Sequence, residues 1–232
     1  MLDGASTREE EEAMNRSGAE TLWEVASVLA REAAAVSRAA GRPAPNLPPL
    51  LFFTDPRRTP RPWETAARLP AGSGVVFRAF GAADARETGL RLREATRRRD
   101  GLLFIGLDPE LAGAVEADGV HLPERALDMA PRLSAARPGW RITGAVHSAE
   151  ALARAQDAGL DAAVLSPVFP AGGASAARLP LGVRAFGDLA GAASIPVYAL
   201  GGVDAENARG LIGSGACGLA AVSAIQEAFG PD

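Results

Sequence analysis

The sequence contains no lysine, and all 24 of its basic residues are arginine. A chain without lysine cannot form a Schiff base with a carbonyl substrate, anchor pyridoxal phosphate or supply the lysine of a P-loop. A genome whose codons favour arginine, alanine and glycine explains this bias without selection for function. The absence therefore limits the mechanisms that are available but identifies none.

Cysteine, long apolar runs and excess positive charge are also missing. The single cysteine, Cys217, excludes an internal disulfide framework, and no apolar run approaches the roughly 18 residues of a membrane span. A formal net charge of -4 and a pI near 5.4 argue against a nucleic-acid surface. The N-terminus carries acidic residues at Glu9 to Glu12 and no basic, apolar signal. We therefore expect a cytoplasmic protein with neither nucleic acid nor membrane as a partner.

The chain divides into a short N-terminal part, residues 1–49, and a main domain, residues 50–232. Residues 1–19 are polar and predict a disordered start. Apolar residues from Leu22 to Val36 then fall on one helical face, and the prolines between 43 and 49 predict a stiff linker. We expect this extra helix to cap the main domain or pack on its flank, and a partner-binding role is the alternative.

The main domain alternates short apolar segments with helical stretches. Eight segments read as strands: 50–54, 74–78, 102–106, 118–122, 141–146, 161–166, 195–200 and 217–222. Strands that alternate with helices pair in parallel, and eight of them close into a barrel. The predicted fold class is therefore α/β, a TIM (β/α)8 barrel with an extra N-terminal helix.

The last two predicted strands are each followed by small residues that could bind a phosphate group. Gly201 and Gly202 follow one strand and Ser223 follows the next. The loops after the seventh and eighth strands of such barrels commonly bind phosphate, because glycines let backbone N–H groups approach the anion. A bulky residue at Gly201 is expected to abolish binding and leave the fold intact. We also expect Asp204 to cap an α-helix that ends near Gly213.

Other polar residues lie near the ends of the predicted strands, where barrel active sites form. Arg78 ends the second strand and Asp108 follows the third, whereas His121 lies in the fourth and His147 follows the fifth. Histidine is the natural proton carrier near neutral pH, so either could be catalytic. The alternatives are that His121 is a satisfied core residue and that His147 only precedes the helix cap Ser148.

Five segments resemble, in order and spacing, the motifs of the thiamine phosphate synthase and thiazole tautomerase family. They read FFTDP (52–56), ADGVHLPE (117–124), ITGAVHSAEAL (142–152), LSPVFP (165–170) and PVYALGGV with SGACGLAAVSAI (196–225). The resemblance implies an α/β barrel. It also implies one of two activities: joining an aminopyrimidine pyrophosphate to a thiazole phosphate with the help of Mg²⁺, or shifting a double bond in the thiazole precursor.

The sequence departs from this family at the positions where the family binds magnesium and the charged groups of its substrates. The position of a lysine after the second strand is Phe80, a magnesium-binding aspartate becomes Leu107, and the second magnesium carboxylate falls on Ala126. A Thr-x-Thr-Lys segment becomes residues 171–174, and the tautomerase histidine aligns with Pro167. The thiazole-phosphate residues Gly201, Gly202 and Ser223 remain. The resemblance therefore implies a degenerate active site.

Replacement residues lie close to the lost positions. Asp108 is one residue beyond the first magnesium position and Glu124 two before the second, so these two are the candidate metal ligands. Arg78 matches the family's pyrophosphate arginine, and Arg57 and Arg58 follow the first strand. Three guanidinium groups could form one anion clamp, because arginine binds phosphate through paired donors. The alternative is that the loop arginines are merely solvated.

Three functions follow from these features, all with a phosphorylated small molecule as partner. The first is a thiamine phosphate synthase-type transferase that binds a phosphorylated thiazole. The second is a metal-independent isomerase that uses His147 or His121, and the third is a non-catalytic ligand-binding or partner protein. The sequence leaves the oligomeric state open.

Overall fold

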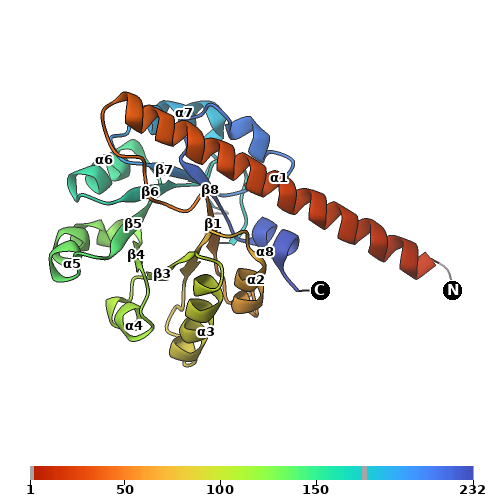
Figure 1. The fold of residues 1–232 in the computed structure, drawn as a ribbon. Helices are drawn as coiled ribbons and strands as arrows, with labels where there is room; N and C mark the ends of the chain where they lie inside the picture. Colours follow the sequence, from red (N-terminus) through yellow and green to blue (C-terminus); the bar gives the residue numbers. More distant parts are fainter. Residues whose placement is uncertain (1–2, 174–176, 232) are drawn as a thin grey trace.

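Eight parallel strands form a closed barrel in chain order, with β8 pairing to β1 (Figure 1). The computed structural model describes residues 3–173 and 177–231. The strands are β1 (Leu50–Phe53), β2 (Gly74–Phe77), β3 (Leu102–Gly106), β4 (Gly119–Leu122), β5 (Arg141–Val146), β6 (Ala162–Leu165), β7 (Val197–Leu200) and β8 (Gly218–Ala221). The prediction of a TIM barrel is confirmed.

Helices surround the barrel, and most connect one strand to the next (Figure 1). The α-helices are α1 (Asp3–Ala39), α2 (Pro62–Arg68), α3 (Ala85–Arg97), α4 (Pro109–Ala114), α5 (Ala130–Ala136), α6 (Ala149–Asp157), α7 (Gly182–Ala192) and α8 (Ser223–Phe229). Two short 3-10 helices, η1 (Glu124–Met129) and η3 (Ala208–Leu211), complete the described elements.

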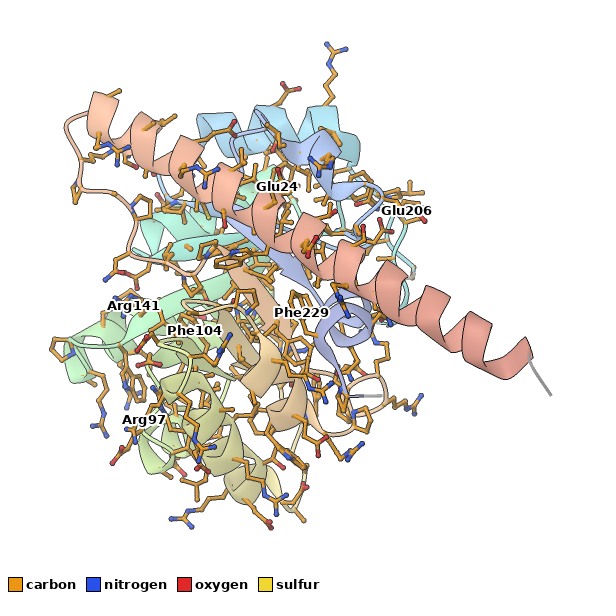
Figure 2. All side chains as sticks on the ribbon, turned by 45° about the vertical axis from the view of Figure 1, so that its right-hand side comes forward. Glu24, Arg97, Phe104, Arg141, Glu206 and Phe229 are labelled. Atoms are coloured by element: carbon orange, nitrogen blue, oxygen red, sulfur yellow. The ribbon has the colours of Figure 1, made fainter. Side chains whose placement is uncertain are left out.

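Side chains alternate along the strands between two apolar clusters. Leu50 and Phe52 belong to the outer cluster beneath the helices, whereas Leu51 and Phe53 belong to the inner one. The buried residues of the inner cluster are Leu51, Phe53, Val76, Phe104, Ala162, Val164, Tyr198, Cys217 and Ala220. Figure 2 labels Phe104 within the barrel. The interior is therefore packed, and space for a ligand is left only at its mouth.

The proline-rich linker lies against the N-terminal ends of the strands. The Tyr198 hydroxyl donates a hydrogen bond of 2.6 Å to the Pro48 carbonyl, and the Leu219 amide donates one of 3.0 Å to that of Pro49. Gly218 permits this approach, because a Cβ there would come within 2.3 Å of the Pro49 oxygen. The linker thus closes the barrel end opposite the loops that follow the strands.

The N-terminal helix α1 packs on the flank of the barrel, beside β8, α8 and η3 (Figure 1). Leu22, Val25 and Leu29 on its inner face are fully buried. The structure differs from the expectation of a disordered start, because α1 already begins at Asp3. Residues 5–14 are rich in alanine, glutamate, arginine and methionine, which favour helix even where little tertiary packing supports them.

The prediction of an α-helix after β7 is wrong. The chain there forms turns and the short helix η3, since Gly210, Gly213 and Gly215 interrupt the segment and polar side chains bind its backbone. α1 packs against η3 and β8 at this place. Glu24, labelled on α1 in Figure 2, pairs with Arg209 of η3 at 2.8 Å. The extra helix α1 therefore covers the part of the barrel surface that a helix between β7 and β8 would otherwise cover.

Candidate functional site

A cavity of about 310 Å³ opens at the carboxyl ends of the strands. The loops after β1, β2, β6, β7 and β8 line it. Its lining residues are Arg58, Arg78, Pro170, Ala171, Gly172, Leu200, Gly201, Gly202, Val203, Asp204, Ala221, Val222, Ser223, Ala224 and Glu227. The structure thus brings together Gly201, Gly202, Ser223, Arg58 and Arg78 from the predicted site. It leaves Arg57, Asp108, Glu124, His121 and His147 outside the lining.

Two glycines with left-handed backbone form one end of the cavity. Gly201 has φ +96° and Gly202 has φ +65°. Neither amide donates a hydrogen bond to another backbone group in the described part of the chain. Since backbone N–H groups are otherwise almost always paired, these two are available to an anion or to water. Ser223, after β8, adds a hydroxyl to the same end of the cavity.

Both glycines also lie directly against the loop between β6 and α7. A Cβ on Gly201 would come within 2.7 Å of Pro167 Cα, and one on Gly202 within 2.3 Å of the Pro170 carbonyl oxygen. The expectation that a bulky residue at Gly201 leaves the fold intact is therefore wrong. Such a side chain must displace backbone and adopt a conformation that glycine alone adopts freely.

Asp204 and Asn207 shape this loop in place of the predicted helix cap. The Asp204 carboxylate accepts hydrogen bonds of 3.0 Å from the Glu206 and Asn207 amides. The Asn207 side chain accepts one from the Asp204 amide and donates one of 2.7 Å to the Gly202 carbonyl. These contacts fix Gly202 with its carbonyl turned toward Asn207.

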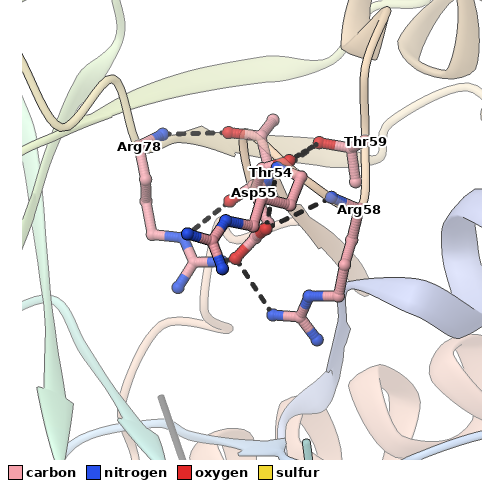
Figure 3. A network of polar contacts seen from close by, with 6 residues as sticks. Thr54, Asp55, Arg58, Thr59 and Arg78 are labelled. Atoms are coloured by element: carbon pink, nitrogen blue, oxygen red, sulfur yellow. Dashed lines mark hydrogen bonds and ion pairs between the residues drawn. The ribbon is translucent and has the colours of Figure 1, made fainter. Parts of the chain in front are cut away.

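Arg78 also lines the cavity, and Figure 3 shows its polar contacts. Its Nε donates a hydrogen bond of 2.7 Å to the Thr54 carbonyl, and its amide donates one of 3.0 Å to the Thr54 hydroxyl. Among the described residues its Nη2 is buried without a hydrogen-bond partner, and an Asp55 carboxylate oxygen lies 3.7 Å away. Burial lowers the pKa of Arg78 and Asp55 partly offsets this effect, but an arginine stays protonated. The cavity is thus lined by a charged guanidinium group whose hydrogen bonds are incompletely satisfied.

Asp55 connects the two cavity arginines, and the sequence analysis missed it. Its Oδ1 accepts from the Arg57 and Arg58 amides at 3.1 and 3.2 Å, and its Oδ2 accepts from Arg58 Nη2 at 3.2 Å (Figure 3). Partial burial raises the pKa of Asp55, but the hydrogen bonds from Arg58 and Arg57 outweigh it, so the pKa lies below its usual value. The sequence feature that could have identified Asp55 as a site residue was its position directly after the first strand.

This turn also separates the two neighbouring arginines. The Arg58 side chain folds back onto Asp55 and lines the cavity, whereas Arg57 is exposed and contributes its amide to the turn. The predicted clamp of three arginines is therefore reduced to Arg58 and Arg78.

Two aromatic rings flank the Arg78 guanidinium. Its central carbon lies 5.6 Å from the Phe53 ring centroid and 5.5 Å from that of Phe80. Phe80, at the position of the family's lysine, is 71% exposed and has φ +49°, a conformation that few bulky residues adopt. The rings hold the cation in place without neutralising its charge.

The two histidines occupy different surroundings, both outside the cavity lining. His121 is buried inside the barrel, with Nδ1 3.0 Å from the Thr143 hydroxyl and its ring edge-on to Phe53. Burial, assisted by the charge of Arg78, lowers the pKa of His121 to about 3, so this imidazole is neutral at pH 7. His147 Nδ1 lies 2.7 Å from the Ser166 carbonyl oxygen and 3.2 Å from the Ser166 hydroxyl.

The residues near the family's magnesium positions do not fit a magnesium ion. Asp108 caps α4 by accepting a hydrogen bond of 2.8 Å from the Leu111 amide, and Glu124 pairs with Arg154 at 3.1 Å. Within the described ranges, no three His, Cys, Asp or Glu residues gather as a metal site would require. Magnesium needs hard oxygen donors, which Leu107 and Ala126 do not offer.

Comparison with known proteins places this barrel in a family. The sequence model described as thiamine monophosphate synthase matches residues 54–225. The chain belongs to the thiamine monophosphate synthase family. It is 35% identical over 193 residues to the thiamine-phosphate synthase of Chlorobium luteolum, covering 82% of this chain and 90% of that protein. It is 32% identical to that of Pyrococcus furiosus, over 77% of this chain and 87% of the relative.

The fold comparison agrees with this membership. The solved thiamine phosphate pyrophosphorylase from Pyrococcus furiosus superposes with a TM-score of 0.67 and 28% identity, covering 79% of this chain and 94% of that one. Membership of the thiamine monophosphate synthase family supports a role in thiamine biosynthesis. None of the helices in the described residues combines the length and apolarity that crossing a membrane requires.

Proposed function

We propose that the barrel binds a phosphorylated thiazole-type ligand and joins it to an aminopyrimidine pyrophosphate, as a thiamine phosphate synthase does. The observation that carries this proposal is a single cavity that both groups of residues line. The Gly201 and Gly202 amides with Ser223 suit a phosphate monoester, and Arg58 and Arg78 suit a diphosphate. Family membership and the names of the relatives support the same reaction.

The chain's own contribution to this reaction is positioning and charge. The thiazole displaces pyrophosphate from the aminopyrimidine, so negative charge grows on the departing diphosphate. The Arg78 guanidinium group, which lines the cavity, supplies positive charge to that group, and Arg58 adds a second guanidinium. Fixed donors in a desolvated site stabilise developing charge without having to reorganise. Magnesium has no role in the proposed reaction, because the residues near the family's magnesium positions do not fit the ion.

The isomerase alternative receives little support from the histidines. A proton carrier works best with a pKa near the working pH, and the pKa of His121 is lowered to about 3. His147 lies outside the cavity lining. The non-catalytic alternative is decided by the experiment that tests the proposal.

Pyrophosphate release from the two substrates should therefore continue in excess chelator at a rate comparable to that with added Mg²⁺. An enzymatic assay for pyrophosphate, run on the wild-type chain with an aminopyrimidine pyrophosphate and a thiazole phosphate, measures this rate. Asp108→Asn is the matched variant, because asparagine still caps α4 but removes the charge of a candidate metal ligand. We expect it to keep its activity.

Two outcomes would reject parts of this proposal. If release requires Mg²⁺ and Asp108→Asn loses it, a relocated metal site operates and the arginine mechanism is wrong. If the thiazole phosphate binds but no pyrophosphate forms under either condition, the chain is a non-catalytic binding protein.

A further inference from the structure

The carboxylate of Asp55 occupies the place where a diphosphate oxygen would meet the cavity arginines. Its Oδ2 lies 3.2 Å from Arg58 Nη2 and 3.7 Å from Arg78 Nη2 (Figure 3). Both guanidinium groups line the cavity. In the free protein, two positive charges at this end are therefore matched by one resident negative charge.

The two arginines differ in how firmly they are held. Arg78 is fixed by the Thr54 carbonyl and lies between Phe53 and Phe80. Arg58 is held only by Asp55 among the residues described, and its side chain is 33% exposed. Its Nη2 also lies beside the loop after β6, since a Cβ on Gly173 would come within 3.0 Å of it. Arg58 can therefore exchange Asp55 for a ligand while Arg78 stays in place.

We propose that Asp55 is a specificity-determining residue that competes with diphosphate for Arg58 and Arg78. Any anion that binds at this end must displace the carboxylate from Arg58 and tolerate its charge beside Arg78. The resident carboxylate thus weakens the hold on pyrophosphate and favours its departure. A phosphate monoester held by the Gly201 and Gly202 amides does not use the two guanidinium groups and is not subject to this competition. The inference rests on the proposed function, because it assumes that the arginine end receives a diphosphate.

The variant Asp55→Asn tests the competition for the arginines without disturbing the turn that Asp55 stabilises. The amide oxygen of Asp55→Asn can still accept from the Arg57 and Arg58 amides, so the turn is preserved. Its NH₂ group cannot accept from Arg58 Nη2, so the ion pair is lost. Thermal unfolding of wild type and variant checks that the fold is unchanged.

Calorimetric titration with inorganic pyrophosphate in excess chelator tests the proposal. Asp55→Asn should bind pyrophosphate about tenfold more tightly than wild type, the scale expected from releasing two partly exposed ion pairs. The gain should shrink as salt is raised. In the Asp55→Asn background, Arg58→Gln should remove most of it. Asp84→Asn is the matched control, because that carboxylate faces Thr88 and pairs with neither cavity arginine.

The outcomes separate the inference from the function on which it rests. If wild type binds pyrophosphate and Asp55→Asn binds it equally or more weakly, Asp55 is not a competitor and the inference is overturned while the proposed function stands. An equal gain from Asp84→Asn would assign the effect to net charge and also overturn it. If neither wild type nor Asp55→Asn binds pyrophosphate, the arginine end is not an anion site, and the proposed function fails with the inference.

Discussion

Replacing Gly202 by alanine should lower the free energy of unfolding by about 3 kcal/mol, the sum expected from backbone strain and overpacking. Gly202 has φ +65°, and a Cβ there would lie 2.3 Å from the Pro170 carbonyl oxygen and 2.8 Å from Phe169 Cβ. Neither neighbour is the end of a flexible side chain, so the loop after β6 must move. Urea unfolding followed by circular dichroism measures the change.

Gly213→Ala is the matched control for this prediction. Gly213 also has a positive φ, +77°, but nothing lies within 4 Å of its Cβ position. We expect it to lose only about 1 kcal/mol, the cost of a left-handed conformation for alanine. Equal losses in the two variants would contradict the close contact between the loops after β6 and β7.

Replacing Arg78 by methionine should weaken pyrophosphate binding by about 1.5–3 kcal/mol, the usual contribution of a hydrogen bond to a charged group. Methionine keeps most of the apolar stem between Phe53 and Phe80 but removes the buried Nη2 donor. Titration calorimetry at low salt measures the affinity.

Arg57→Met removes the same charge from the neighbouring loop without touching the cavity, since that side chain is exposed and outside the lining. Its effect on pyrophosphate binding should be small, because exposed charges are screened. A loss as large as that of Arg78→Met would show that pyrophosphate responds to the overall charge of the region and not to a defined arginine site.

The barrel could be predicted from the sequence because each strand is a short apolar run bounded by turn residues. The segments 102–106 and 141–146 match β3 and β5, and the other strands differ from their predicted bounds only at their ends. The grouping of Gly201, Gly202 and Ser223 was also predictable, because position at a strand end and glycine conformation are local properties. Gly201, Gly202 and Ser223 accordingly lie around one cavity.

What the sequence did not reveal depends on tertiary contacts. Arg57 and Arg58 are equivalent as sequence neighbours, and only the turn around Asp55 directs one of them into the cavity. The segment after β7 has an apolar pattern that fits a helix, but it is held as a loop by the hydrogen bond that the Asp204 carboxylate accepts from the Asn207 amide and by the one that the Asn207 side chain donates to the Gly202 carbonyl. Asp108 and Glu124 lie close in sequence to the lost metal positions, yet a helix cap and an ion pair engage them.

The central claim is that this cavity recognises the phosphate group of a thiazole-type ligand. Calorimetric titration of the wild-type chain with a thiazole phosphate and with the corresponding alcohol, both in excess chelator, tests it most directly. The account predicts binding of one phosphate ester per chain and little or no binding of the alcohol, because the Gly201 and Gly202 amides, which bond to no other backbone group among the described residues, favour an anion over a neutral hydroxyl. Equal affinity for the two compounds, or no binding of the phosphate ester, would contradict it.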